Sequence, residues 1–313
     1  MTDTIKKQRR ILKGKHKDLI FYILMIAYPI IQFCIFYIGV NSNSFLLAFQ
    51  RIDPVTGLTT RWTFDVLVAA FKEMTSPTLL ATLQLSLQSY FILTGISIPL
   101  SLFFSYYIYK KMPFANAFKV ILFVPSIISG IVMVSMYRFF IGEAIPDLIE
   151  MLTGAEPGSV VGLLDIKEYR YPMIIFFNIW VGFGGGILMY SNAMSGISTE
   201  VVESAHLDGA TGFREFWHIT LPLVYPTLST FLITGVAGIF GNQLALFSFY
   251  GEGAKSELWT YGYFLYIETK RVASAGREAY PRLSAMGMVL TCVVIPVTFL
   301  VRFLLEKFGP SVD

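Results

Sequence analysis

The sequence predicts an all-α, polytopic membrane protein with six transmembrane helices. Of its 313 residues, 55% are hydrophobic and only 14% are charged, whereas charged residues make up about 25% of an average soluble domain. Long apolar segments recur along the chain, and about 20 such residues suffice for a helix to cross a bilayer core. The net charge of +3 is mild and gives no indication of nucleic-acid binding.

The apolar segments predict where the chain crosses the membrane. We expect one membrane domain at residues 19–309, with spans at about 19–40, 79–109, 118–140, 171–194, 223–249 and 283–305. The stretches at 41–76, 141–170 and 250–282 are mixed or polar and are expected outside the cell.

Basic residues at the N-terminus set the predicted orientation. They are Lys6, Lys7, Arg9, Arg10, Lys13, Lys15 and Lys17. Lys and Arg are enriched in cytoplasmic loops, so residues 1–18 are expected to form a basic cytoplasmic tail. Six spans then place the C-terminus in the cytoplasm too, along with the loop at 195–222. A signal peptide is the alternative, but the run at 19–40 is too long and no small-residue cleavage site follows it.

The polar stretch at 195–222, between the fourth and fifth spans, predicts a helix-turn-helix. Ser198 or Thr199 can cap the first helix, and Gly209 can adopt the left-handed conformation that ends it. Val201, Val202 and Ala205 make one side of that helix apolar.

The second helix of this stretch carries three aromatic residues at helical spacing. Phe213, Phe216 and Trp217 are expected to share one face. Pro222 disfavours helix at Leu221, so we expect a break before the fifth span.

This stretch resembles the docking loop of permease subunits of binding-protein-dependent ABC importers. Their pattern is Glu-Ala-Ala, three residues, Gly, nine residues, Ile-x-Leu-Pro; this chain matches it at Glu203, Ala205, Gly209, Ile219, Leu221 and Pro222. Ser204 replaces the first Ala. Asp208-Gly209-Ala210 and Phe216-Trp217 further resemble the carbohydrate-uptake branch, in which the chain is similar to the first permease type of maltose transporters. The alternative is an amphipathic interfacial loop with chance matches.

The resemblance implies that the helix around 203–207 docks onto a cytoplasmic ATPase. The residues expected to couple the two proteins are Glu203, Ser204, Ala205, Asp208, Gly209, Ile219, Leu221 and Pro222. It further implies a bacterial cell-membrane complex with a second, different permease, two ATP-binding subunits and an extracellular substrate-binding protein.

The sequence predicts no enzyme chemistry in this chain. It lacks the Gly-x-x-x-x-Gly-Lys-Ser/Thr loop of ATP-binding proteins, so ATP and Mg²⁺ are expected on the partner subunits. We find no plausible Ser-His-Asp set, no metal site and no cofactor site. Cys34 and Cys292 both lie in apolar runs, which argues against a disulfide framework.

Polar and aromatic residues inside the spans are the candidates for a substrate path, because unpaired polar groups are costly in lipid. They are Gln84, Gln88, Tyr137, Asn178, Trp180, Asn242 and Gln243. Amides offer donors and acceptors to hydroxyl groups, and aromatic faces stack on sugar rings. The alternative for each is an interhelical hydrogen bond or a place in the interfacial belt. Charged residues occur only near the ends of spans, which favours a neutral substrate.

Four glycines at 182 and 184–186 lie inside the fourth span. No Lys-Ser/Thr follows, so this run predicts close helix packing or a local helix break rather than a phosphate site. Two other functions stay open: a self-contained secondary transporter and a membrane scaffold without a transport pathway. The first typically shows internal repeats and buried ionisable residues, and neither is clear in this sequence.

Overall fold

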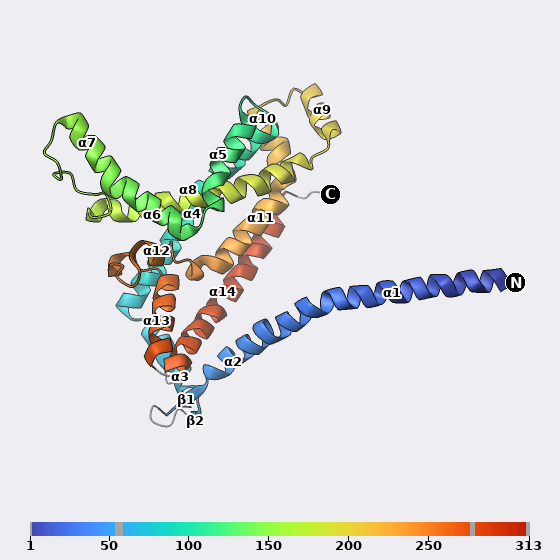
Figure 1. Ribbon diagram of the computed structural model, residues 1–313, viewed down its shortest axis with the longest axis horizontal. Coiled ribbons are helices and arrows are strands. Elements are labelled where there is room, and N and C mark those ends of the chain that lie inside the picture. Colours follow the sequence, from blue (N-terminus) through green and yellow to red (C-terminus); the bar gives the residue numbers. More distant parts are fainter. Residues whose placement is uncertain (1, 54–58, 276–278, 311–313) are drawn as a thin grey trace. The chain divides into compact units, whose positions relative to one another are not determined.

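The computed structural model describes residues 2–53, 59–275 and 279–310 and is mainly helical (Figure 1). The chain divides into two compact units. The first combines Met1–Lys72 with Val272–Val289, and the second combines Glu73–Arg271 with Leu290–Asp313.

The first unit begins with a long continuous helix. Its elements are α1 (Thr2–Gln32), the π-helix η1 (Phe33–Gly39), α2 (Val40–Leu47), β1 (Gln50–Ile52) and β2 (Thr59–Trp62). The expected basic tail at 2–18 is therefore helical and continues into the first apolar span. The strands pair antiparallel with Gln50 opposite Trp62, a small hairpin that the all-α expectation did not include.

The second unit holds most of the helices. Three helices contain residues of both units: α3 (Asp65–Met74), α13 (Tyr261–Ala275) and α14 (Tyr280–Phe308). The other elements are α4 (Pro77–Tyr109), α5 (Ala115–Ile127), α6 (Gly130–Phe139), η2 (Phe140–Ala144), α7 (Ile145–Thr153), α8 (Lys167–Ser195), α9 (Thr199–Leu207), α10 (Phe213–Glu215), η3 (Phe216–Thr220), α11 (Leu221–Gly238), η4 (Ile239–Gly241), α12 (Leu246–Tyr250) and η5 (Ser256–Leu258).

Five helices of the described chain are long and apolar enough to cross a membrane, or six if one bent pair forms a single span. They cover Lys17–Leu47, Pro77–Tyr109, Lys167–Ser195, Phe213–Tyr250 and Tyr280–Phe308. Within the second unit, α7 and α9 lie at opposite ends of α8 (Figure 1). The chain is therefore a multi-pass helical membrane protein.

The expected third span at 118–140 coincides with this bent pair and is broken by a bend. Helix α5 stops at Ile127, α6 starts at Gly130, and the helices Ala115–Ile127 and Gly130–Thr153 meet at 102°. Ile128 and Ser129 are extended, with ψ of 143° and 131°. Pro125 and Gly130 flank this break, and both residue types weaken a helix.

The expected fifth span at 223–249 is also interrupted. The α-helix ends at Gly238, a short 3₁₀ turn follows, and α12 begins only at Leu246. Leu244 and Ala245 lie between the 3₁₀ turn and α12. Their φ angles are 52° and 57°, left-handed values that an α-helix does not contain. The break places non-helical backbone within a segment long enough to span the membrane.

The glycine run of α8 serves close packing, because α8 continues unbroken through it. A Cβ added at Gly184 would meet the backbone oxygen of Leu122 in α5, and one at Gly186 would lie 2.8 Å from Ser101 Oγ in α4. Ser101 and Ser105 of α4 donate hydrogen bonds to the carbonyls of Phe183 (3.2 Å) and Ile187 (2.9 Å). Helices α4 and α5 therefore pack closely against the backbone of α8.

Two apolar clusters lie among the described residues of the second unit. The larger joins α6 and α8 to the segment between Leu244 and Ile267. The smaller joins α4, α8, η3 and α11 through Leu102, Tyr190, Met194, Phe216 and Val224. The smaller cluster lies where the loop at 195–222 meets the helices.

Substitution of Gly184 tests the packing of α8. We expect Gly184→Ala to destabilise the protein by about 1–3 kcal/mol, because the added methyl collides with rigid backbone of α5. Gly182→Ala is the matched control: nothing lies within 4 Å of its added Cβ, and the higher helix propensity of Ala favours the change. Thermal unfolding in detergent measures both, and equal melting temperatures for the two variants would contradict the close contact.

Candidate functional site

Helix α9 is the first half of the predicted docking loop. The Ser198 hydroxyl accepts the backbone N–H of Val201 at 3.4 Å, so Ser198 caps the helix start. Asp208 is the C-cap, and Gly209 follows with φ of +78°. The local signals for this helix in the sequence thus correspond to its observed ends.

The outer surface of α9 is open to solvent. Glu203, Ser204 and Asp208 are exposed, whereas Ala205 is only 6% exposed and faces the protein. Leu207 is 90% exposed, a high value for an apolar side chain. The helix therefore presents an apolar side chain between two acidic residues.

The aromatic residues of the second half stack together. Ring centroids of Phe213 and Trp217 lie 6.0 Å apart, and those of Phe216 and Trp217 lie 5.8 Å apart. Phe216 is 2% exposed and packs on Phe103 and Tyr106 of α4. Phe213 and Trp217 are 66% and 53% exposed. Phe216 anchors the loop, and its two neighbours remain accessible.

The expected helix break at Leu221 is wrong. Leu221 is helical, with φ of −62° and ψ of −45°, and α11 continues directly from the π-helix η3. In the π turn the backbone hydrogen bonds join residues five apart instead of four, so the pattern shifts just before Pro222. The helix therefore continues through this proline, which has no backbone N–H to donate. Ile219, at the end of η3, and Leu221 and Pro222, at the start of α11, are half-buried.

A buried carboxylate ties the two halves of the loop to α4. Glu215 is 0% exposed, and its Oε2 lies 2.7 Å from Lys110 Nζ and 2.8 Å from His206 Nε2. Lys110 is the C-cap of α4, and His206 lies in the last turn of α9. The Tyr106 hydroxyl of α4 also donates to the Gly212 carbonyl at 2.9 Å.

Sequence reasoning missed Lys110, Leu207 and Glu215 at this site. Lys110 directly follows the second span predicted at 79–109. Nothing in the sequence pairs it with Glu215, which is 105 residues away by number (215 − 110). The sequence did contain one indication that the Glu215 carboxylate is buried: Glu215 lies between the aromatic residues Phe213 and Phe216.

The structure gathers three substrate-path candidates at the break in the fifth span. Asn178 of α8 donates to the Leu244 carbonyl at 3.1 Å. Asn242 Oδ1 accepts the Leu244 N–H at 2.8 Å, and the Asn242 carbonyl accepts the Thr260 hydroxyl at 2.7 Å. The Gln243 carbonyl accepts the Leu246 N–H. Asn178, Asn242 and Gln243 therefore lie around one stretch of irregular backbone.

The other candidates occupy different surroundings. The rings of Tyr137 and Trp180 lie 6.3 Å apart, and both line a cavity of about 560 Å³. Its remaining walls are apolar: Met133, Met136, Phe139, Phe140 and Phe176. The Tyr137 hydroxyl already donates to the Met173 carbonyl at 2.9 Å. Gln84 and Gln88 are exposed one turn apart on α4.

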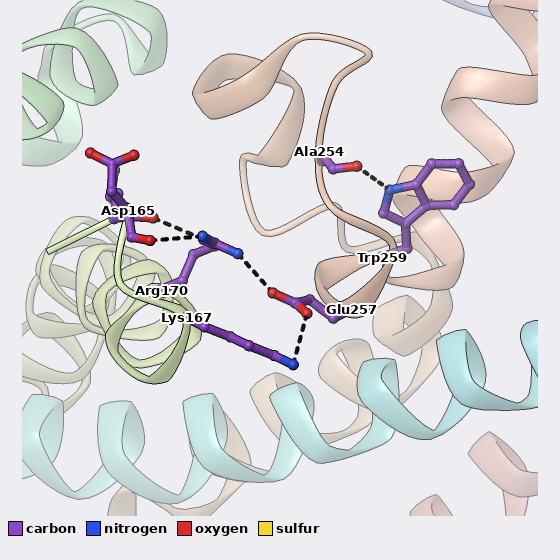
Figure 2. A network of polar contacts seen from close by, with 7 residues as sticks. Asp165, Lys167, Arg170, Ala254, Glu257 and Trp259 are labelled. Atoms are coloured by element: carbon purple, nitrogen blue, oxygen red, sulfur yellow. Dashed lines mark hydrogen bonds and ion pairs between the residues drawn. The ribbon is translucent and has the colours of Figure 1, made fainter. Parts of the chain in front are cut away.

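A polar network orders the segments beyond the opposite end of α8. Figure 2 shows Arg170 between Asp165 and Glu257. Its guanidinium donates to the carbonyls of Leu164 (2.8 Å) and Asp165 (3.1 Å) and to Glu257 (2.7 Å). Lys167 lies 3.7 Å from the other oxygen of Glu257. These contacts link the start of α8 to the segment that precedes α13.

Potential metal ligands do not cluster in the described residues. Among residues 2–53, 59–275 and 279–310, no three His, Cys, Asp or Glu side chains are placed to hold a metal ion. The candidate site comprises the loop at 195–222 and the polar break in the fifth span.

The chain thus combines a multi-pass helical fold with an exposed, anchored helix between two spans. The chain matches the family "Binding-protein-dependent transport system inner membrane component" over residues 97–313, and it belongs to that family. The family expected from the motif around Glu203–Pro222 is confirmed. The chain is accordingly a multi-pass protein of the bacterial inner membrane.

The chain is similar to several curated proteins, and two of them, AraP and YteP, are by name permeases of carbohydrate transport systems. Protein LplB of Bacillus subtilis is 27% identical over 64% of this chain, and the arabinooligosaccharides transport system permease protein AraP of the same organism is 25% identical over 67%. The chain spans 61% of LplB and 66% of AraP, less than two thirds of each. The polygalacturonan/rhamnogalacturonan transport system permease protein YteP of B. subtilis is 23% identical, with 95% of this chain and 93% of YteP covered.

Solved structures share the fold. A chain of a bacterial ABC transporter involved in the import of the acidic polysaccharide alginate superposes with a TM-score of 0.75. The match covers 96% of this chain and 99% of that chain at 19% identity. A second structure of the alginate transporter, in complex with a periplasmic protein bound to an alginate pentasaccharide, matches with a TM-score of 0.73 at 20% identity, over 94% of this chain and 96% of that one.

Substitution of Asn178 tests how the break at Leu244 is held. Asn178→Leu removes the donor to the Leu244 carbonyl, and one such hydrogen bond contributes about 1 kcal/mol. We expect the amides of Leu244 and Leu246 to exchange with deuterium roughly fivefold faster. Mass spectrometry of the peptide across the break measures this. Asn192→Leu, at an exposed position on the same helix, is the control. Unchanged exchange in Asn178→Leu would mean that Asn178 does not support the break.

Proposed function

We propose that this chain is the membrane-spanning permease subunit of an ATP-driven ABC importer for a sugar or oligosaccharide. It forms half of a translocation pathway and pairs with a second, different permease. An extracellular binding protein delivers the substrate, and two ATP-binding subunits supply the energy. The observation that carries the proposal is α9, whose outer surface is exposed while its base is anchored by Glu215. Family membership and the names of the relatives support it.

The proposed orientation places both termini and the loop at 195–222 in the cytoplasm. Helix α9 then inserts into a groove of one ATPase as a helix-in-groove contact. Leu207 supplies an apolar anchor, and Glu203 and Asp208 pair with basic groups of the partner. The small side chain of Ala205 lets α9 lie close to its own protein.

The ATPases hold ATP and Mg²⁺ in this proposal, and this chain carries no catalytic residue. When the two ATPases close on ATP, α9 moves with its subunit and displaces the helices attached to it. ATP hydrolysis then resets the arrangement. This is coupling between two distinct sites through a two-state element.

The break in the fifth span supports the proposed substrate path. Non-helical backbone at membrane depth is tolerated only where protein buries it or where it lines a water-filled cavity. Asn178, Asn242 and Gln243 surround this break and offer amide groups to sugar hydroxyls. Gln84 and Gln88 of α4 provide two further exposed amides. Tyr137 and Trp180 provide aromatic faces rather than polar contacts, since their cavity is apolar.

Co-purification from the native membrane in mild detergent tests the proposal. We expect wild type to bring down an ATPase, a second permease and a binding protein, and Gly209→Pro to lose the ATPase. Proline fixes φ near about −65°, whereas Gly209 has φ of +78° and positions the end of α9.

The matched control is Gly154→Pro, which makes the same change at φ of +70° at the end of α7. This variant should retain the ATPase. If wild type purifies without any ATPase, the importer proposal fails, and a self-contained transporter or a scaffold becomes the working hypothesis.

Leu207→Asp tests the docking surface itself. Because Leu207 is 90% exposed, its loss should leave the stability of the free chain within about 0.5 kcal/mol. A central apolar anchor contributes about 2 kcal/mol or more to an interface. We therefore expect ATPase binding to weaken roughly 30-fold, measured by titration of the ATPase onto the purified permease complex. Leu152→Asp, at a 73% exposed position on α7, should bind normally; equal affinities for both variants would exclude Leu207 from the interface.

A further inference from the structure

Glu215 joins three elements through one oxygen atom. Its side chain is fully buried, and its Oε2 contacts both Lys110 Nζ at 2.7 Å and His206 Nε2 at 2.8 Å. Lys110 ends α4, His206 belongs to α9, and Glu215 lies at the end of α10. The carboxylate therefore lies between the docking helix and the end of the second span.

The α4 side of this joint is rigid. Tyr106, one turn before Lys110, donates to the Gly212 carbonyl at 2.9 Å, so α4 holds the start of α10 as well as its end. The Lys110 ammonium lies 5.8 Å from the ring centroids of both Tyr106 and Tyr109. Phe216 stacks on Phe103 one turn further into α4.

The α9 side depends on His206. Of the α9 side chains that the structure describes, His206 alone hydrogen-bonds to another element. Ala205 packs inward beside it, and the rest of this helix is exposed or half-exposed. Few contacts therefore connect α9 to the membrane helices. The contact of His206 with Glu215 is the one that involves a buried carboxylate.

Separating these groups is unfavourable. A buried carboxylate that is separated from Lys110 and His206 is left uncompensated in a medium that solvates it poorly. The end of α9, α10 and the end of α4 therefore move together. Helix α4 is one continuous helix from Pro77 to Tyr109 and carries Gln84 and Gln88, so movement at Lys110 is conveyed along the span.

We propose that Glu215 is a positioning residue that transmits displacement of α9 to α4. The inference rests on the proposed ATPase docking and adds a defined route into the membrane. Glu215 contacts neither nucleotide nor sugar in this proposal; it acts through Lys110 and His206.

The test measures movement of α4 directly, in the complex purified with its ATPase. Cys34 and Cys292 are free and exposed, so both are first replaced by Ser. Gln88→Cys on α4 then reports accessibility to a charged methanethiosulfonate reagent. Labelling rates are compared without nucleotide and with ATP, Mg²⁺ and vanadate, and no sugar is needed.

With Glu215 intact, we expect the nucleotide condition to change the labelling rate of Gln88→Cys. In Glu215→Gln and in Lys110→Met this response should fall at least about fivefold, the lower end of typical allosteric coupling. The double variant should lose no more than the more affected single variant, because both act through one contact. Glu306→Gln is the control: it breaks an exposed pair with Arg302 (2.7 Å) on α14 and should leave the response unchanged.

A full response in Glu215→Gln overturns the proposal, as does the absence of any response when Glu215 is intact. Should Glu215→Gln fail to assemble with the ATPase, Lys110→Met decides, and a full response there overturns the proposal too. A reference complex that contains no ATPase is a different result, since it rejects the importer function itself.

Discussion

The contact of α4 with α8 is the constraint on which the rest of the second unit depends. In a bilayer, apolar helices gain nothing by leaving the lipid for one another, so close packing and hydrogen bonds must hold them. Ser101 and Ser105 donate to backbone carbonyls of α8, and Gly184 and Gly186 leave room for neighbouring helices. The loop at 195–222 is attached to the ends of both helices: α8 leads into α9, and α4 ends at Lys110.

The break in the fifth span shows a second constraint, the need to satisfy backbone polar groups at membrane depth. The Leu244 N–H and carbonyl are bound by Asn242 and Asn178, and the Asn242 carbonyl is bound by Thr260. These side chains stabilise irregular backbone that lipid alone would not permit. This need for hydrogen bonds explains why the amide side chains of Asn178 and Asn242 gather at the break. The aromatic cavity beside Tyr137 differs, because the Tyr137 hydroxyl is already used by Met173.

Local signals in the sequence predicted local structure well. Residue type and spacing predicted a cap at Ser198 or Thr199, a left-handed Gly209, and either close packing or a helix break at the α8 glycines. The structure has Ser198 as the cap and an unbroken, closely packed α8. The helix break predicted from Pro222 was wrong, because the sequence does not reveal that a π turn precedes this proline. The two interrupted spans also escaped prediction. Proline and glycine occur in many membrane helices, and hydropathy measures apolar length without reporting whether the helix is continuous.

By itself, the sequence determined that this chain is a helical membrane protein of a binding-protein-dependent transport family. Hydropathy and a short motif are encoded in contiguous residues, so they can be identified without a fold. The tertiary structure alone decided that Glu215 pairs with Lys110 and His206, that Asn178 supports Leu244, and that α5 and α6 meet at a sharp angle. These features join residues distant in the chain or depend on how helices pack, and a buried charge reveals its partners only when the helices that carry them are assembled.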